Sequence, residues 1–112
     1  PLLYRRTHYN HPCTVWARTA RDNFLWLYDH GIAMSEEYSR RYGRVHKSSY
    51  VIQRAHAFAD LIPAGSMTPF AQAMPDKYRA DQAVEAYRAY YIAEKATIAK
   101  WAHSDAPSWW LQ

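Results

Sequence analysis

The chain has 112 residues, a formal net charge of +4 and an aromatic share of 16 %. This length suffices for one domain with a core and excludes a second, and no apolar run of about 18 residues is present to span a membrane. The single cysteine, Cys13, excludes an internal disulfide. We therefore expect one soluble, cytoplasmic domain over residues 1–112.

The first ten residues lack an apolar period and indicate an extended lead-in. Asn10 and Pro12 resemble a helix start, with Asn10 as the N-cap and Pro12 in the first turn. The sequence therefore predicts a short helix from Cys13 to Ala20.

Three possible metal ligands lie close together near this start: His8, His11 and Cys13. Zinc sites usually draw a second pair of ligands from defined spacing elsewhere in the chain, and that spacing is absent. We expect no metal and no cofactor.

One long helix is predicted from Asp22 to Gly43, with Asp22 as the N-cap and Gly43 ending the helix in a left-handed conformation. One polar stripe forms an ordinary solvated edge and consists of Asp29, Glu36 and Arg40. A second polar stripe consists of Asn23, His30, Glu37 and Arg41. Apolar residues that should be covered by other elements lie among it: Trp26, Leu27 and Met34. Polar groups on such a face need partners.

Two interpretations of this second stripe stand side by side. In the first it is a structural network in which Glu37 pairs with Arg41 four residues later. In the second it is the wall of a pocket, where His30 carries protons, Glu37 acts as its partner or as a general base, and Arg41 holds an anion. Spacing alone does not separate them.

Positive charge is concentrated after this helix. Residues 1–56 hold nine Lys and Arg against four Asp and Glu (9 − 4 = +5), whereas residues 57–112 hold five against six (5 − 6 = −1). The densest cluster consists of Arg40, Arg41, Arg44, His46 and Lys47. Cations favour a helix C-terminus, but five exceed what that requires. Tyrosines interleave with the basic residues at 4–9 and 40–50, a mixture typical of nucleic-acid binding.

A third helix is predicted from Tyr50 to Leu61, capped by Ser48 or Ser49 and ended by Pro63. Three prolines and a glycine then interrupt the chain at 63–80 and exclude a continuous helix. This loop carries three apolar residues that predict a lid or wall: Met67, Phe70 and Met74.

Asp81 is the predicted N-cap of a last helix that runs to about Ala102. Glu94 falls within its aromatic stripe, where it either accepts hydrogen bonds from tyrosine hydroxyls or acts as a catalytic acid or base. Trp109 and Trp110 are too apolar for water, so they close the core or cover a partner chain. With no alternating strand pattern, the chain is predicted to be all-α: a compact bundle of about four helices with a long structured loop before the last.

Three runs of sequence resemble a group of short phage-encoded proteins over nearly the whole chain. They are NHPCTVWARTARDNFLWLYDHGIAMSEEYSRRYGRVHKS, TPFAQAMPDKYR and VEAYRAYYIAEKATIAKWA with PSWW. More distantly, the chain resembles the pyrimidine-dimer DNA glycosylase/AP lyase family, whose members are all-α enzymes that flip out a base and cleave through an imine. That resemblance implies an N-terminal amine as nucleophile, a glutamate that stabilises the sugar intermediate, and arginines on phosphates. It also implies the cytoplasm of a phage-infected host cell as the location.

The start of the chain departs from this family. The similar phage proteins carry a basic helix upstream of Pro1, and Pro-Leu-Leu-Tyr does not match the family's first residues. We expect that segment to be missing here or to reside in a partner chain. Pro1 has a secondary amine capable of imine chemistry, but it is not expected to be the nucleophile.

The preferred hypothesis is a phage-type protein that binds damaged or single-stranded DNA and excises or modifies a flipped-out base. Its expected phosphate ligands are Arg18, Arg40, Arg41, Arg44, His46 and Lys47. Trp26 and Trp101 are expected to receive the base, and His30, Glu37 and Glu94 to supply acid and base chemistry.

Two alternatives stay open. In the first, the chain is a non-enzymatic phage inhibitor or assembly protein that docks through its C-terminal tryptophans. The partner in that case is another protein or a second copy of this chain. In the second, it is a nucleotide-processing enzyme in which Glu37 and Glu94 use a divalent ion.

Overall fold

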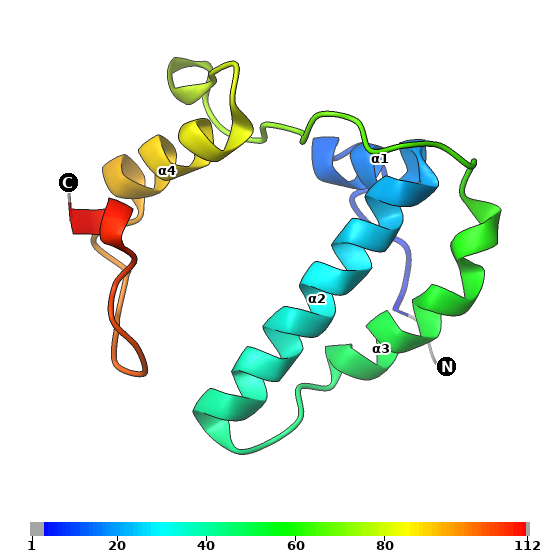
Figure 1. The fold of residues 1–112 in the computed structure, drawn as a ribbon, viewed down its shortest axis with the longest axis horizontal. Coiled ribbons are helices and arrows are strands. Elements are labelled where there is room, and N and C mark those ends of the chain that lie inside the picture. The colour runs from blue at the N-terminus through cyan, green and yellow to red at the C-terminus, as the bar shows by residue number, and fades with distance from the viewer. Residues whose placement is uncertain (1–3, 112) are drawn as a thin grey trace. The chain divides into compact units, whose positions relative to one another are not determined.

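The computed structural model describes residues 4–111, and this part of the chain is all-helical with four α-helices and no strand (Figure 1). The α-helices are α1 (Pro12–Thr19), α2 (Arg21–Tyr42), α3 (Ser48–Ala55) and α4 (Ala83–Glu94). Three 3-10 helices are η1 (His56–Leu61), η2 (Asp76–Tyr78) and η3 (Ser108–Leu111). The all-α class, the four helices and the irregular stretch before the last of them are confirmed. Within residues 4–111, no helix combines the length and apolarity needed to cross a bilayer.

The chain divides into two units, Pro1–Thr68 (unit 1) and Pro69–Gln112 (unit 2). Unit 1 contains α1, α2, α3 and η1, and unit 2 contains η2, α4 and η3. The expectation of a single domain stays a prediction.

In unit 1, the N-cap of α1 lies one residue later than predicted, whereas the helix itself begins at Pro12, one residue before the predicted Cys13. His11 is the N-cap, since its Nδ1 accepts a hydrogen bond from the Cys13 backbone N–H at 3.1 Å, so the assignment of Asn10 was wrong. Pro12 occupies the first turn as predicted, where its missing N–H costs nothing. The helix buries Trp16, whose indole N–H donates to the Thr68 carbonyl at 3.2 Å.

The long helix α2 starts without a side-chain cap. Ala20 is its N-cap residue, so the prediction for Asp22 was wrong. Backbone N–H groups of the first turn donate instead to carbonyls of the stretch after η1, Arg21 to Pro63 at 2.8 Å and Asp22 to Gly65 at 3.2 Å. A tertiary contact therefore satisfies the donors for which the sequence suggested a local cap.

Asn23 is fully buried at the junction of α1, α2 and the stretch that follows η1. Its Nδ2 donates to the Trp16 carbonyl at 2.8 Å and to Thr68 Oγ1 at 2.9 Å. Its Oδ1 accepts from the Thr68 backbone N–H at 2.9 Å. Every polar atom of this side chain is thus paired, and the three segments are joined through it.

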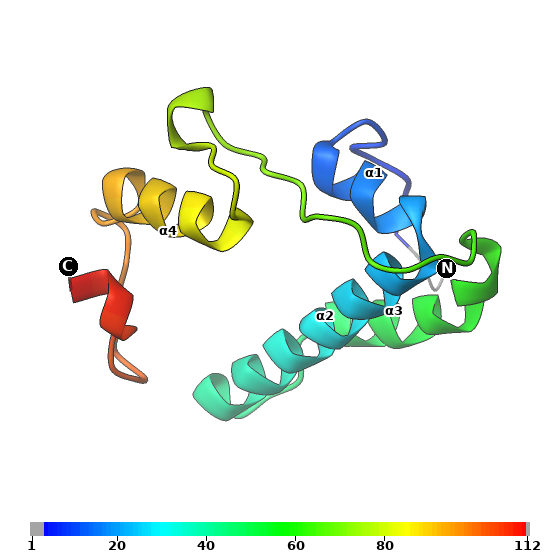
Figure 2. The ribbon, with the colours of Figure 1, turned by 45° about the horizontal axis from the view of Figure 1, so that its top comes forward.

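The end of α2 is as predicted. Gly43 has a φ of 67°, and its N–H donates to the Ser39 carbonyl at 2.8 Å. A left-handed residue at this position suits glycine because it has no Cβ. The turn that follows reverses the chain, and α3 with η1 returns along α2 (Figures 1 and 2).

Gly31 allows α3 to approach α2 closely, since a Cβ at this position would meet the Ile52 Cδ1 at 3.1 Å. Two residues of the apolar row that was expected to be covered, Trp26 and Met34, remain 38 % and 61 % exposed. The cover over this row is therefore only partial among the described residues of unit 1.

In unit 2, α4 is shorter than predicted. It begins after Gln82 rather than Asp81, and it ends at Glu94, with Lys95 as the C-cap residue whose N–H closes the last turn on the Tyr91 carbonyl. The residues that follow form turns, so the predicted extension to Ala102 was wrong. Branched side chains at 97 and 98 make that continuation less favourable.

Tyr87 connects α4 to the first residues of unit 2. Its hydroxyl donates to the Ala71 carbonyl at 2.6 Å and accepts from the Ala73 N–H at 3.1 Å. Gln72 bonds both backbone groups of Ala80 in the same segment. Side-chain hydrogen bonds therefore hold the loop before α4 in a defined conformation, in agreement with the prediction of a structured loop.

Candidate nucleic-acid interface

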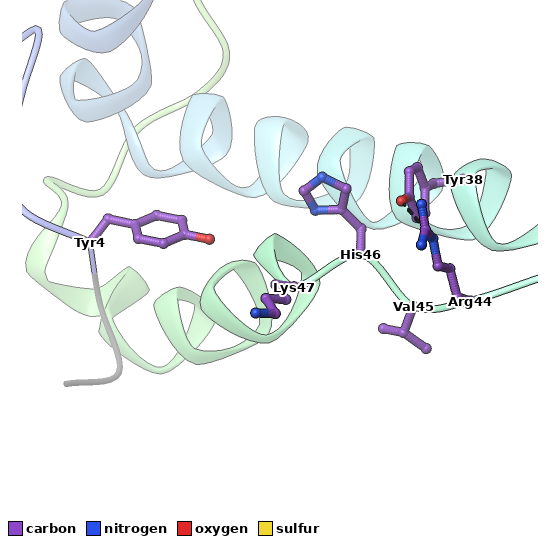
Figure 3. Close-up of a pocket in the computed structure, with 6 residues that line it drawn as sticks. All are labelled: Tyr4, Tyr38, Arg44, Val45, His46 and Lys47. Atoms are coloured by element: carbon purple, nitrogen blue, oxygen red, sulfur yellow. Dashed lines mark hydrogen bonds between the residues drawn. The ribbon is translucent and has the colours of Figure 1, made fainter. Parts of the chain in front are cut away.

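A surface pocket of about 410 Å³ lies where the end of α2, the turn after it and the start of α3 meet (Figure 3). Its lining residues are Tyr4, Tyr38, Arg44, Val45, His46 and Lys47. None of these is acidic, and two are permanent cations. Such a lining attracts an anion and offers aromatic rings beside it.

Tyr38 on α2 organises the turn side of the pocket. Its hydroxyl accepts a hydrogen bond from Arg44 Nε at 3.2 Å, shown by the dashed line in Figure 3. The His46 ring stands edge-on to the Tyr38 ring, with centroids 4.8 Å apart and an interplanar angle of 86°, and Tyr42 packs 4.9 Å away. These contacts fix the Arg44 side chain through its Nε and leave its two terminal amino groups for a ligand.

The start of α3 forms the other side of the pocket. His46 Nδ1 accepts from the Ser48 backbone N–H at 3.1 Å, which places the proton of the neutral ring on Nε2 as a donor. The Tyr4 hydroxyl is 3.1 Å from Ser48 Oγ and shares a hydrogen bond with it. The lead-in, expected only to be extended, is thus attached to α3 and supplies a pocket residue.

The predicted basic cluster separates into two kinds of cation. Arg40 bonds both carboxylate oxygens of Glu37, at 2.9 and 2.5 Å, and Arg41 Nε bonds Glu37 at 2.6 Å. The Glu37–Arg41 pair of the network interpretation is therefore present. Within residues 4–111, Arg44 and Lys47 make no ion pair with a carboxylate. The charge of these two side chains is therefore not offset by a carboxylate of the described chain and is available to an anionic ligand.

The pKa of Glu37 falls from its ordinary value of 4.5 to about 2, because hydrogen bonds from Arg40 and then Arg41 stabilise the carboxylate. A carboxylate with so low a pKa holds a proton poorly near neutral pH. This environment favours a structural role for Glu37 over the predicted role as acid or base.

The depressed pKa of Glu37 predicts a defined pH dependence of stability. The ionised form is favoured in the folded state, so its contribution is complete above about pH 4.5 and is lost as the pH falls towards about 2. Glu37→Gln should lower the melting temperature near pH 7 and bring it closer to the native value near pH 2. Thermal unfolding followed by circular dichroism at both pH values measures this. An equal difference at both would contradict the assignment.

His30 and Trp26 form a separate pair on α2. The two rings stack with centroids 5.1 Å apart and an interplanar angle of 9°, and Trp16 meets Trp26 edge-on at 5.9 Å. One face of the Trp26 ring is therefore covered by His30. A flipped base at Trp26 would have to use another face or displace the imidazole.

Arg18, the other predicted phosphate ligand of unit 1, contacts the lead-in. Its Nη1 donates to the Tyr9 carbonyl at 2.5 Å, and its guanidinium carbon lies 3.9 Å from the centroid of the Tyr9 ring. Both contacts fix the segment before α1. The structure thus connects Arg18 to local packing rather than to the pocket lining.

The predicted site residues of unit 2 have partners of their own. The Glu94 carboxylate accepts a hydrogen bond from Tyr78, which raises the pKa of that phenol above its ordinary value of 10. Trp101 lies edge-on to Trp110, with centroids 5.4 Å apart, and Trp109 packs on the same Trp110 ring at 5.6 Å. Glu94 and Trp101 belong to unit 2. That they form one site with the predicted residues of α2 therefore stays a prediction.

No three His, Cys, Asp or Glu side chains gather within residues 4–111 in a way that could hold a metal ion. Pro1 lies outside the described residues, so nothing follows for its amine. Comparisons with protein-family models, curated proteins and solved structures find no match to this chain.

Three pocket residues were not among the predicted site residues: Tyr4, Tyr38 and Val45. The signal was present, because both tyrosines lie close to basic residues in the sequence. The rings expected to receive a base, Trp26 and Trp101, already contact other tryptophans or a histidine. Proximity to cations without a carboxylate partner is the better predictor of which aromatic ring lines the pocket.

Proposed function

We propose that this protein binds nucleic acid through the pocket at the end of α2. The main support is that the pocket lining contains no acidic residue. Two of its cations, Arg44 and Lys47, have no carboxylate partner within residues 4–111. In contrast, Arg40 and Arg41, which lie outside the lining, both pair with Glu37. A polyanion is the partner that Arg44 and Lys47 select, because each phosphate contact releases condensed counterions.

The distribution of charge supports the same unit as the binding unit. Residues 1–68 hold nine Lys and Arg against five Asp and Glu, a balance of 9 − 5 = +4. Residues 69–112 hold five of each, a balance of 5 − 5 = 0. The whole net charge of the chain thus belongs to unit 1, which favours nucleic acid approaching that unit.

Base excision or modification remains an expectation from the resemblance. His30 stacks on a tryptophan, Glu37 is held by two arginines and Glu94 bonds a tyrosine, so each predicted acid or base has a packing or pairing role. The proposal therefore covers binding and assigns no bond cleavage. Docking through the C-terminal tryptophans and metal-dependent nucleotide processing likewise stay predictions.

The test compares two arginines near the same helix end. Arg44→Ala should weaken the binding of a labelled oligonucleotide about five- to tenfold at about 0.1 M salt, because it removes a cation without a carboxylate partner. Arg40→Ala is the matched control and should change the affinity less than about twofold, because the Glu37 carboxylate offsets the charge of Arg40. Fluorescence anisotropy titrations measure both affinities.

Equal losses in the two variants would show that the pocket is not the site and that binding follows net charge alone. Absence of binding by the native chain would refute the proposal. Circular dichroism confirms that both variants keep the helical content of the native protein.

A further inference from the structure

We infer that the pocket takes a single unpaired nucleotide of a nucleic-acid strand, with phosphates of that strand on Arg44 and on Lys47 and the base on the ring of Tyr4, and with little preference among bases. This inference rests on the proposed function and specifies the class of nucleic acid: single-stranded segments rather than intact duplex.

Tyr4 has the properties of a stacking platform. Its hydroxyl is anchored to Ser48 Oγ at 3.1 Å, whereas its side chain is the more exposed of the pocket's two tyrosines, with 67 % of the residue surface accessible. Figure 3 shows the ring extending towards the start of α3. A ring held at one end and open on its faces can receive a base without first being ordered.

The second aromatic residue of the pocket serves a different purpose. Tyr38 contacts the rings of Tyr42 and His46 and accepts a hydrogen bond from Arg44, so its surroundings are largely occupied by protein. Its role is to position the Arg44 guanidinium, whose free terminal amino groups suit a phosphate. Stacking and phosphate binding are thus divided between two tyrosines on opposite sides of the pocket.

An unpaired base fits this arrangement better than a paired one. In a duplex the flat faces of the bases are covered by their neighbours, so only a single-stranded or extruded nucleotide can place a base face on Tyr4. A volume of about 410 Å³ lies within the range of roughly 300–1000 Å³ typical of small-ligand sites. The pocket therefore has room for one nucleotide beside its cations.

The lining also indicates tolerance of base identity. None of the lining residues is Asn, Gln, Asp or Glu, the side chains that read adenine and cytosine edges. Arg44 and Lys47, which can read guanine, are assigned here to phosphates. Stacking on a tyrosine ring accepts every base, since each has an aromatic face.

The experiment compares an oligothymidine and an oligoadenosine of about 12 nucleotides with a duplex of the same length, by fluorescence anisotropy at about 0.1 M salt. The native chain should bind both single strands at least about tenfold more tightly than the duplex, and the two single strands within about threefold of each other.

Three tyrosine variants locate the contact. Tyr4→Ala should weaken single-strand binding roughly tenfold, and Tyr4→Phe, which keeps the ring without the bond to Ser48, should stay within about threefold of the native chain. Tyr50→Ala is the matched control, an equally exposed tyrosine on α3 outside the pocket lining, and should bind like the native chain.

Failure of the inference and failure of the proposed function give different results. Equal affinity for duplex and single strand, or an unchanged affinity in Tyr4→Ala, would overturn the inference while Arg44→Ala still weakens binding. Absence of binding to every oligonucleotide would overturn both. The comparison of strands uses the native chain alone, so it decides the question even if Tyr4→Ala fails to fold.

Discussion

Replacing Asn23 with alanine is expected to lower the free energy of unfolding by about 3 kcal/mol, the largest stability effect foreseen for any single side chain here. The substitution removes three hydrogen bonds in a buried site, those to the Trp16 carbonyl, to Thr68 Oγ1 and from the Thr68 N–H. Burying polar groups unpaired costs more than the bonds themselves contribute, so the loss should exceed that of an ordinary core truncation of this size.

Urea denaturation followed by circular dichroism measures the change for Asn23→Ala. Asn10→Ala is the matched control, because Asn10 is an exposed asparagine in the turn before α1, and its variant should unfold within about 0.5 kcal/mol of the native chain. A loss below about 1 kcal/mol for Asn23→Ala would show that the junction of α1, α2 and the segment ending at Thr68 does not depend on this side chain.

The combined variant Arg44→Ala and Lys47→Ala is expected to weaken single-strand binding about 30-fold at about 0.1 M salt. Both cations line the pocket, and neither has a carboxylate partner among the described residues. The losses of binding free energy from the two substitutions should add approximately, because each residue contacts the polyanion through its own charge.

The matched control for the double variant is Lys77→Ala with Arg79→Ala, which removes two cations from unit 2 and leaves the pocket intact. That control should bind within about threefold of the native chain, since neither residue lines the pocket and exposed charges that do not contact the ligand are largely screened at this salt concentration. Anisotropy titrations with one labelled oligothymidine compare all three proteins. Similar losses in both double variants would contradict a localised site.

The order and type of the elements could be predicted from the sequence because their signals are local. Pro12 in the first turn of α1 and Gly43 at the end of α2 each act through their own backbone conformation. The interruption before α4 follows equally from its prolines. Such residues impose the same constraint whatever surrounds them.

The helix starts were predicted poorly because distant residues satisfy them. Carbonyls of Pro63 and Gly65 accept from the first turn of α2, so Asp22 was not needed as a cap. No pattern within α2 reports this contact, since its partners lie about 40 residues later in the chain. Similarly, the paired state of Asn23 depends on Thr68, and its polar stripe gave no sign of that partner.

The candidate site was predicted in part. The sequence identified Arg44, His46 and Lys47 within a basic cluster, and the structure places all three on one pocket. It could not show which arginines remain without a carboxylate, because Glu37 lies three and four residues from Arg40 and Arg41 and either pairing satisfies helical spacing. Tyr4 was missed because its position depends on a hydrogen bond to a residue 44 positions away.

The salt dependence of single-strand binding tests the central claim most directly. For the native chain, the logarithm of the association constant should fall linearly with the logarithm of salt concentration, with a slope of at least about −1.4 if Arg44 and Lys47 each neutralise one phosphate. In the double variant of these residues the slope should become shallower by about 1.4. A native slope near zero, or the same slope in both proteins, would contradict binding of nucleic acid at this pocket.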